Sequence, residues 1–347
     1  MGKKKKKNSI FRTAAGLAAA GAAAYGGYAY YLFRQAFDSR HSRFHPNGPI
    51  TDSFALAAGS DWLRASNRND DYLQSYDGLT MHAVRVENHP DSRKWMVMFP
   101  GFHRCALDLL HLMREADERG WNMLVIDPRG SGQSQGSFTG LGWPEHYDLI
   151  AWINYLVVLR PEAAIALYGV DMGGSAVMNA LGDYLPVNVK AAVEEGGYSE
   201  IREELVFLAD KYTEIPTRPF LPMINVLVKQ FLHFSMNDIS TLRQLSQCEI
   251  PLLLLHGSDD EMVPESMAED CARACHSESS LVVFPSTGFG GCRYHEDYAD
   301  TIFDFAEKYC NGEESAPEKE EVKTEEKAEE EKAEAETAAE AEAETAE

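Results

Sequence analysis

The sequence predicts an α/β protein built on a mostly parallel sheet, because strand-length apolar runs alternate with helix-length segments. The runs lie in the central part of the 347-residue chain, at residues 95–99, 123–126, 164–168, 190–194 and 251–255. Apart from Lys190 and Glu194 at the ends of one run, their residues are apolar at consecutive positions, which is typical of strands buried on both faces. Such alternation builds parallel sheets through right-handed crossovers, with helices on the faces. We therefore expect one α/β domain.

A β-hairpin is predicted before the first of these runs. Residues 72–87 alternate apolar and polar side chains on either side of Asp77 and Gly78. Alternation with period two is the pattern of a half-buried strand, and Asp-Gly favours a tight turn. We expect this hairpin to lead into the sheet.

The first forty residues are predicted to form a membrane anchor. A basic run at residues 3–7 precedes 21 uncharged residues, 13–33. At about 1.5 Å per residue this segment is roughly 30 Å long, enough to cross the core of a lipid bilayer. The positive-inside rule then predicts a single-pass protein of the cell membrane, with a cytoplasmic N-terminus and an extracytoplasmic main domain. A cleaved signal peptide has the same pattern and would give a secreted protein, so that alternative stays open.

The rest of the chain is acidic, and its charge excludes one class of partner. The formal net charge is −23, of which residues 313–347 contribute −12. This C-terminal segment is almost wholly Glu, Ala, Lys and Thr, so we expect a disordered acidic tail. The domain between the ends, residues 41–312, carries −18. Because nucleic-acid phosphates are repelled by such a charge, we expect no nucleic-acid partner.

The six cysteines leave two interpretations open. They stand at positions 105, 248, 271, 275, 292 and 310. An exported domain could pair them in up to three disulfides, whereas in a reducing compartment they would be buried thiols. No Cys-x-x-Cys pair occurs, and Cys271 and Cys275 lack histidines at metal-binding spacing. We therefore expect no metal site.

Polar or glycine-rich segments follow four of the predicted strands. In parallel sheets, ligand-binding and catalytic residues lie at the carboxyl ends of the strands. These segments are therefore the candidate site. They read Phe-Pro-Gly-Phe-His at 99–103, Asp-Pro-Arg-Gly-Ser-Gly-Gln-Ser at 127–134, Gly-Val-Asp-Met-Gly-Gly at 169–174 and His-Gly-Ser-Asp-Asp-Glu-Met-Val-Pro at 256–264.

In order and spacing these segments resemble the α/β-hydrolase superfamily, most of all membrane-anchored bacterial members related to the serine aminopeptidase and monoglyceride lipase branch. The resemblance covers roughly residues 60–310. It implies the α/β-hydrolase fold, a mostly parallel sheet flanked by helices, with a small helical cap at about 197–247. It also implies serine-hydrolase ancestry of the esterase, lipase or aminopeptidase kind, and no cofactor.

The resemblance assigns catalytic positions, but two of the three lack the usual residue. Asp171 stands where the Gly-x-Ser-x-Gly elbow holds the nucleophilic serine. Asp260 matches the triad acid, with Asp259 as a neighbouring candidate, and Phe289 takes the place of the histidine after the last strand. Serine-hydrolase chemistry is therefore not available at these positions, which predicts a pseudoenzyme.

The oxyanion hole is expected to survive this loss. It is built from main-chain amides, here those of Phe102 and Met172, which do not depend on side-chain identity. We expect the Asp171 carboxylate to compete with a substrate for these donors.

Two other functions remain open. Asp171 could act as nucleophile, as in haloalkane dehalogenases and epoxide hydrolases, with His103 or His295 as a substitute base. Alternatively, a pocket under the cap could bind a small apolar or ester-like ligand, or a partner, without turnover. The sequence does not indicate an oligomeric state. A disulfide between Cys105 and Cys292 is a further hypothesis, since the resemblance places both at the rim of the pocket.

Overall fold

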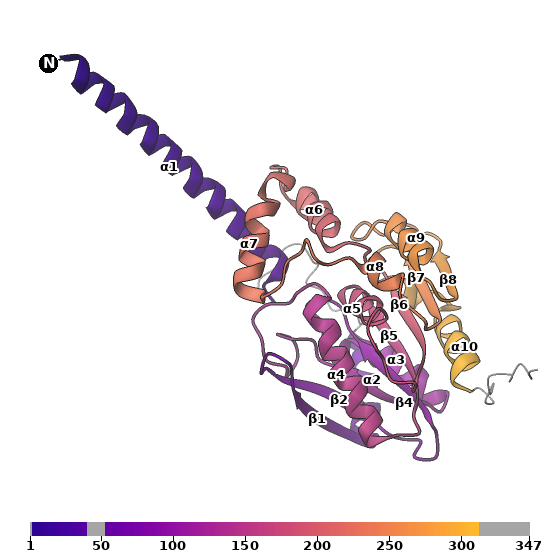
Figure 1. Ribbon diagram of the computed structural model, residues 1–347. Helices are drawn as coiled ribbons and strands as arrows, with labels where there is room; N and C mark the ends of the chain where they lie inside the picture. The colour runs from indigo at the N-terminus through magenta and orange to yellow at the C-terminus, as the bar shows by residue number, and fades with distance from the viewer. Residues whose placement is uncertain (1, 40–52, 312–347) are drawn as a thin grey trace, which may run out of the picture. The chain divides into compact units, whose positions relative to one another are not determined.

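The computed structural model describes residues 2–39 and 53–311, and these form the expected sheet (Figure 1). Eight strands lie in the order β1-β2-β4-β3-β5-β6-β7-β8. The six strands from β4 across to β8 are parallel, and β1 and β2 extend the β4 edge as antiparallel strands. The strand bounds are β1 Arg68–Gln74, β2 Thr80–Val86, β3 Lys94–Phe99, β4 Asn122–Ile126, β5 Ala164–Val170, β6 Val189–Glu195, β7 Leu252–Gly257 and β8 Ser279–Phe284.

The strand and hairpin predictions are confirmed: the ends of the five predicted strands shift by at most two residues, and the hairpin begins at Arg68, four residues earlier than predicted. In the hairpin, β1 and β2 pair antiparallel with Gln74 opposite Thr80. The Ser75 amide donates to the Leu79 carbonyl at 2.8 Å and closes the turn around Gly78, whose φ of 86° favours glycine.

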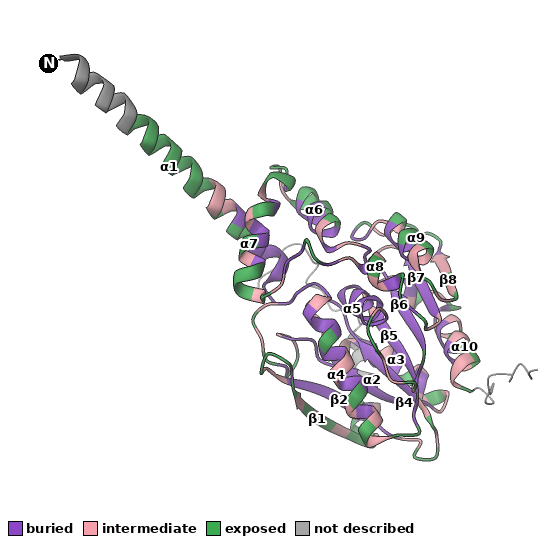
Figure 2. Cartoon of the chain, viewed as in Figure 1, coloured by how far each residue is buried: buried purple, intermediate pink, exposed green. Residues whose placement is uncertain are grey.

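Helices cover both faces of the sheet, and the buried strands lie between them (Figure 2). In β3, Val97 and Phe99 pack on one face with α4, α5 and α9, whereas Met96 and Met98 pack on the other with α3 and α10. The helices are α1 Gly2–Phe37, α2 Ser53–Ala65, α3 Leu110–Glu118, α4 Trp143–Leu159, α5 Met172–Ala180, α6 Ile201–Tyr212, α7 Leu221–Leu232, α8 Thr241–Leu245, α9 Glu265–Ala274 and α10 Tyr298–Cys310, with short 3-10 turns η1 Ala106–Leu109, η2 Arg218–Phe220 and η3 Cys292–Tyr294.

The motif at residues 127–134 has a structural role. Its Arg129 is buried and forms two hydrogen bonds of 2.8 Å to the Asp148 carboxylate of α4. The Asp127 carboxylate accepts a hydrogen bond from the Gln133 amide and lies 2.7 Å from Nδ1 of His82. Paired in this way, the buried charges connect the loop to α4 and β2.

The expected cap between β6 and β7 is present as α6, α7 and α8. The inner side of α7 is filled rather than hollow, since Ile224 and Val228 are fully buried in the hydrophobic cluster on the α4 and α5 face. This favours the interpretation of the cap as a cover for the core.

Helix α1 also packs into this cluster at its C-terminal end. Leu32, Phe33 and Phe37 are fully buried there. The Phe33 ring lies 5.4 Å from that of Phe138 and 5.5 Å from that of Phe231 in α7, measured between ring centroids. The end of α1 is therefore part of the folded domain.

The predicted transmembrane span at residues 13–33 finds no support in the structure. Among the described residues, no helix combines the length and the apolar character needed to cross a membrane. The segment is rich in Ala and Gly, which are weakly hydrophobic, and its Tyr25 hydroxyl donates to the Pro219 carbonyl at 2.8 Å. The predicted acidic tail, residues 313–347, lies outside the described residues.

Replacing Phe33 by Ala tests the role of α1 in the domain. We expect the Phe33→Ala variant of the full chain to lose about 3–5 kcal/mol of unfolding free energy, because a buried ring is exchanged for a cavity. Urea denaturation measures this loss. The matched control is Leu17→Ala on the same helix, where the side chain is 71% exposed and the expected change is within about 0.5 kcal/mol. Equally small losses in both variants would contradict the packing described.

Candidate functional site

The sharp turn between β5 and α5 places Asp171 at the carboxyl edge of the sheet. Its backbone has φ 56° and ψ −120°, a conformation that non-glycine residues adopt only under constraint. A Cβ added at Gly169 would lie 2.3 Å from the Gly173 carbonyl oxygen, and one at Gly173 would lie 2.1 Å from that of Phe99. Because side chains are excluded at both glycines, the turn keeps the geometry of a nucleophile elbow.

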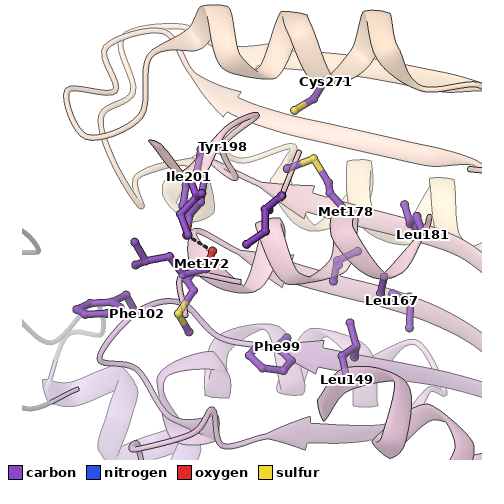
Figure 3. Close-up of a cluster of buried hydrophobic side chains, with 14 of the residues drawn as sticks. Phe99, Phe102, Leu149, Leu167, Met172, Met178, Leu181, Tyr198, Ile201 and Cys271 are labelled. Carbon is purple, nitrogen blue, oxygen red and sulfur yellow. Dashed lines mark hydrogen bonds between the residues drawn. The ribbon is translucent and has the colours of Figure 1, made fainter. Parts of the chain in front are cut away.

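The Asp171 carboxyl group occupies the expected oxyanion hole. Its Oδ2 accepts a hydrogen bond from the Phe102 amide at 3.0 Å, and the Met172 amide also donates to the carboxyl group. Asp171 therefore accepts hydrogen bonds from both amides that the sequence analysis assigns to an oxyanion hole. Figure 3 shows Phe102 and Met172 within the buried hydrophobic cluster, to which Tyr198 also belongs. The Tyr198 hydroxyl donates to the Leu141 carbonyl at 2.8 Å.

The environment of Asp171 favours its protonated form. Burial raises the pKa of this carboxyl group to about 7, and the Phe102 amide opposes the shift. The nearby Asp260 raises the pKa further, whereas Arg104 lowers it. Near neutral pH the group is thus a mixture of carboxylic acid and carboxylate.

Asp260, the residue at the triad acid position, lies close to this elbow. Its Oδ1 accepts the amides of Met262 at 2.7 Å and Val263 at 3.0 Å, and burial raises its pKa. The neighbouring candidate, Asp259, is exposed and hydrogen-bonds Ser258. Of the two, only Asp260 therefore faces the candidate site.

Phe289 lies in the same part of the site as Asp260. Both line one small pocket that also includes Val170, the residue before the elbow aspartate. The phenyl ring thus stands beside the acid, where the family holds an imidazole, and it can neither accept nor deliver a proton.

The two histidines considered as substitute bases have other contacts. The His295 ring packs on Phe284, with centroids 4.8 Å apart, and its Nδ1 lies 3.8 Å from the Asp297 carboxylate. His103, at φ 58°, packs edge-on against the Phe102 ring at 4.2 Å. These contacts turn His295 toward the start of α10 and place His103 against the oxyanion loop.

Two buried acids near the site are missing from the sequence prediction, and a buried histidine, His256, lies in the segment 256–264 without a predicted role. Glu204 of α6 is 2% exposed, neither of its oxygens has a hydrogen-bond partner among the described residues, and burial followed by Asp171 and Asp260 raises its pKa. Burial also raises the pKa of Glu194, behind the elbow, to about 8. His256 at the end of β7 interacts electrostatically with Asp260 and bonds the Val263 carbonyl at 3.0 Å.

One signal in the sequence could have found Glu194. A charged residue inside an otherwise apolar strand is unusual, and Glu194 and Glu195 are the last two residues of β6. For Glu204 there is no such signal, since an acid in an amphipathic cap helix is normally solvated.

The cysteines are all free thiols, so the Cys105–Cys292 disulfide hypothesis is wrong. Cys292 is buried at the start of η3, where its thiol is hydrogen-bonded to Glu195, whereas Cys105 lies at the start of η1. No group of three or more His, Cys, Asp or Glu side chains within residues 2–39 and 53–311 is arranged to hold a metal ion.

Comparisons with known proteins show which proteins this chain resembles in sequence. A family model described as serine aminopeptidase, S33, matches residues 90–233. An uncharacterized protein of Bacillus subtilis, YqkD, is 24% identical over 57% of this chain and 65% of its own length. The α/β-hydrolase domain-containing protein WAV2 of Arabidopsis thaliana is 27% identical over 74% of this chain and 82% of its own.

Solved structures agree on the fold. An esterase of Pyrococcus furiosus superposes with a TM-score of 0.59 at 18% identity, covering 72% of this chain and 95% of the esterase. An esterase of Exiguobacterium antarcticum gives 0.52 at 18% identity, covering 69% and 100%. The chain has the α/β-hydrolase fold, and over residues 90–233 it is similar to the serine aminopeptidase family.

The raised pKa of Asp171 predicts a pH-dependent stability. The pKa is 3.8 for the ordinary group and about 7 in the fold, so the folded state holds the proton more tightly and loses stability as pH rises from about 4 to 7. Asp171→Asn cannot ionise. In urea denaturation we expect this variant to gain up to about 4 kcal/mol over the wild type between about pH 4 and pH 8.

The control for this titration is Asp259→Asn at the exposed neighbour of Asp260. It should follow the wild type across the same pH range. If Asp171→Asn also followed the wild type, Asp171 would not be the buried titrating carboxyl group.

Proposed function

We propose that this chain is a catalytically inactive α/β-hydrolase homologue that uses its site to bind a ligand. The observation that carries the proposal is the hydrogen bond from the Phe102 amide to the Asp171 carboxyl group at 3.0 Å. A side chain of the protein itself thereby takes the donor that would stabilise the oxyanion of an acyl substrate. A substrate oxygen could bind the Phe102 amide only if the Asp171 carboxyl group moved away from it.

The side chains around this hydrogen bond also support the absence of turnover. Asp171 has no hydroxyl group to attack an ester, and Phe289 beside Asp260 has no nitrogen to act as base. The acid position, the elbow geometry and the amide donors are retained, while the two proton-transferring groups are absent.

The alternative with Asp171 as nucleophile is less well supported. Attack on an alkyl carbon needs the ionised carboxylate, and the ester formed must then be cleaved by an activated water molecule. The pKa of about 7 leaves a large fraction of Asp171 protonated at neutral pH. His295, one candidate for activating the water, contacts Phe284 and Asp297.

Ester hydrolysis by the full chain tests the proposal. With p-nitrophenyl acetate and butyrate as substrates, we expect no turnover above buffer for the wild type and for Asp171→Asn. The double variant Asp171→Ser/Phe289→His restores nucleophile and base, so we expect a rate about 100-fold or more above wild type. Release of p-nitrophenol is followed by absorbance.

The single variant Asp171→Ser is the matched control, because it has the nucleophile without the base. We expect it to remain far below the double variant. Wild-type turnover that disappears in Asp171→Asn would overturn the proposal and show that Asp171 is catalytic.

A further inference from the structure

Two of the cysteines lie next to each other in the fold, although they are far apart in the chain. The thiols of Cys248 and Cys275 share a hydrogen bond. Cys248 follows α8, the last helix of the cap, and Cys275 directly follows α9. Each cysteine precedes one of the parallel strands β7 and β8, so the pair lies at the edge of the sheet opposite to the elbow.

The main chain joins the two segments at the same point. The Leu245 carbonyl accepts both the Cys248 amide at 3.1 Å and the His276 amide at 3.0 Å. A disulfide has strict limits on the separation of the two Cα atoms, and it cannot form where the backbones lie far apart. Here one oxygen atom binds both segments and the thiols are already in contact, so a disulfide needs no large movement of the main chain.

The two thiols have different environments. Cys248 is fully buried in the hydrophobic cluster on the α4 and α5 face, whereas Cys275 is partly exposed. The hydrogen bond with Cys248 lowers the pKa of the Cys275 thiol, burial opposes this shift, and the Ser277 amide adds to it. The thiolate is the nucleophilic form of cysteine. Cys275 is therefore the thiol that meets reagents from solvent, and Cys248 lies behind it.

We propose that Cys248 and Cys275 form a redox site, in which a peroxide converts the two free thiols into a disulfide. The Cys275 thiolate attacks one oxygen of hydrogen peroxide and breaks the O–O bond, which leaves a sulfenic acid and, once the leaving oxygen is protonated, water. The Cys248 sulfur then attacks the sulfenic sulfur, and its proton and the leaving hydroxide form a second water. Two thiols and one peroxide thus give one disulfide and two water molecules.

The disulfide closes a loop that contains part of the candidate site. Between the two cysteines lie β7, the segment that holds Asp260, and α9. Joining the ends of a loop reduces the entropy of the unfolded chain and so stabilises the fold. Oxidation therefore ties the end of the cap to α9. The inference stands apart from the proposed function, because the pair does not lie at the elbow.

Mass spectrometry of the full chain tests the pairing. The reduced protein is treated with a small molar excess of hydrogen peroxide, its remaining thiols are blocked with N-ethylmaleimide in denaturant, and it is digested without reduction. Cleavage after Glu249, Arg273 and Glu278 separates the cysteines of this region from one another. We expect a crosslinked pair of peptides that carries Cys248 and Cys275, and we expect dithiothreitol to separate it.

Two results of this digest would overturn the proposal. One is a crosslink from either member of the pair to Cys271, which is buried one helical turn before Cys275. The other is the recovery of Cys248 and Cys275 as blocked thiols after peroxide treatment.

Serine variants separate the roles of the two thiols. Cys248→Ser keeps the thiol that reacts first, so we expect a sulfenic acid to accumulate at Cys275, where dimedone traps it. Cys275→Ser should form no disulfide and leave Cys248 as a thiol. The matched control is Cys310→Ser on α10, a partly exposed cysteine outside the pair, which should form the disulfide as the wild type does.

Thermal unfolding measures the effect of the disulfide on the fold. We expect the oxidised wild type to unfold about 5 °C or more above the reduced protein. Cys275→Ser, at a partly exposed position, should fold and should unfold at the same temperature with and without peroxide. A shift in this variant equal to that of the wild type would show that another site is oxidised and would end the proposal.

Discussion

The contact between the Phe102 amide and the Asp171 carboxyl group joins the two loops around which the site is built. One loop ends β3 and the other ends β5, and these strands are paired in parallel at the centre of the sheet. Glycine at 173 lets the two loops approach to distances that any side chain would prevent. The strained backbone of Asp171 persists because this packing leaves it no alternative.

The charges around the elbow are divided between two sides. Toward the cap, Glu204 and Asp260 lie near Asp171, and burial raises the pKa of all three carboxyl groups. Toward α3 and α10, the arginines at 104 and 293 line a second small pocket. Asp108 and Glu195 line that pocket as well, so the two arginines on the α3 and α10 side lie among carboxylates.

The C-terminal end of helix α1 is part of the hydrophobic core of the domain. Phe33 and Phe37 of α1 are buried with the cap helix α7 in the cluster that also fills the α4 and α5 face of the sheet. The sequence pattern gives no sign of this packing, because an uncharged segment of helix length does not reveal what its side chains pack against. The aromatic residues at its end pack against rings from distant parts of the chain.

The sequence by itself determined the sheet, the hairpin, the elbow with Asp171 and the absence of a histidine at 289. These follow from periodicity and from short motifs, which are local. Only the tertiary structure decided that Asp171 is buried enough to have a pKa of about 7, that Glu204 joins it, that Cys105 and Cys292 stay apart, and that Arg104 and Arg293 share a pocket. Each of these depends on desolvation and on distances between residues far apart in the chain, neither of which a local pattern contains.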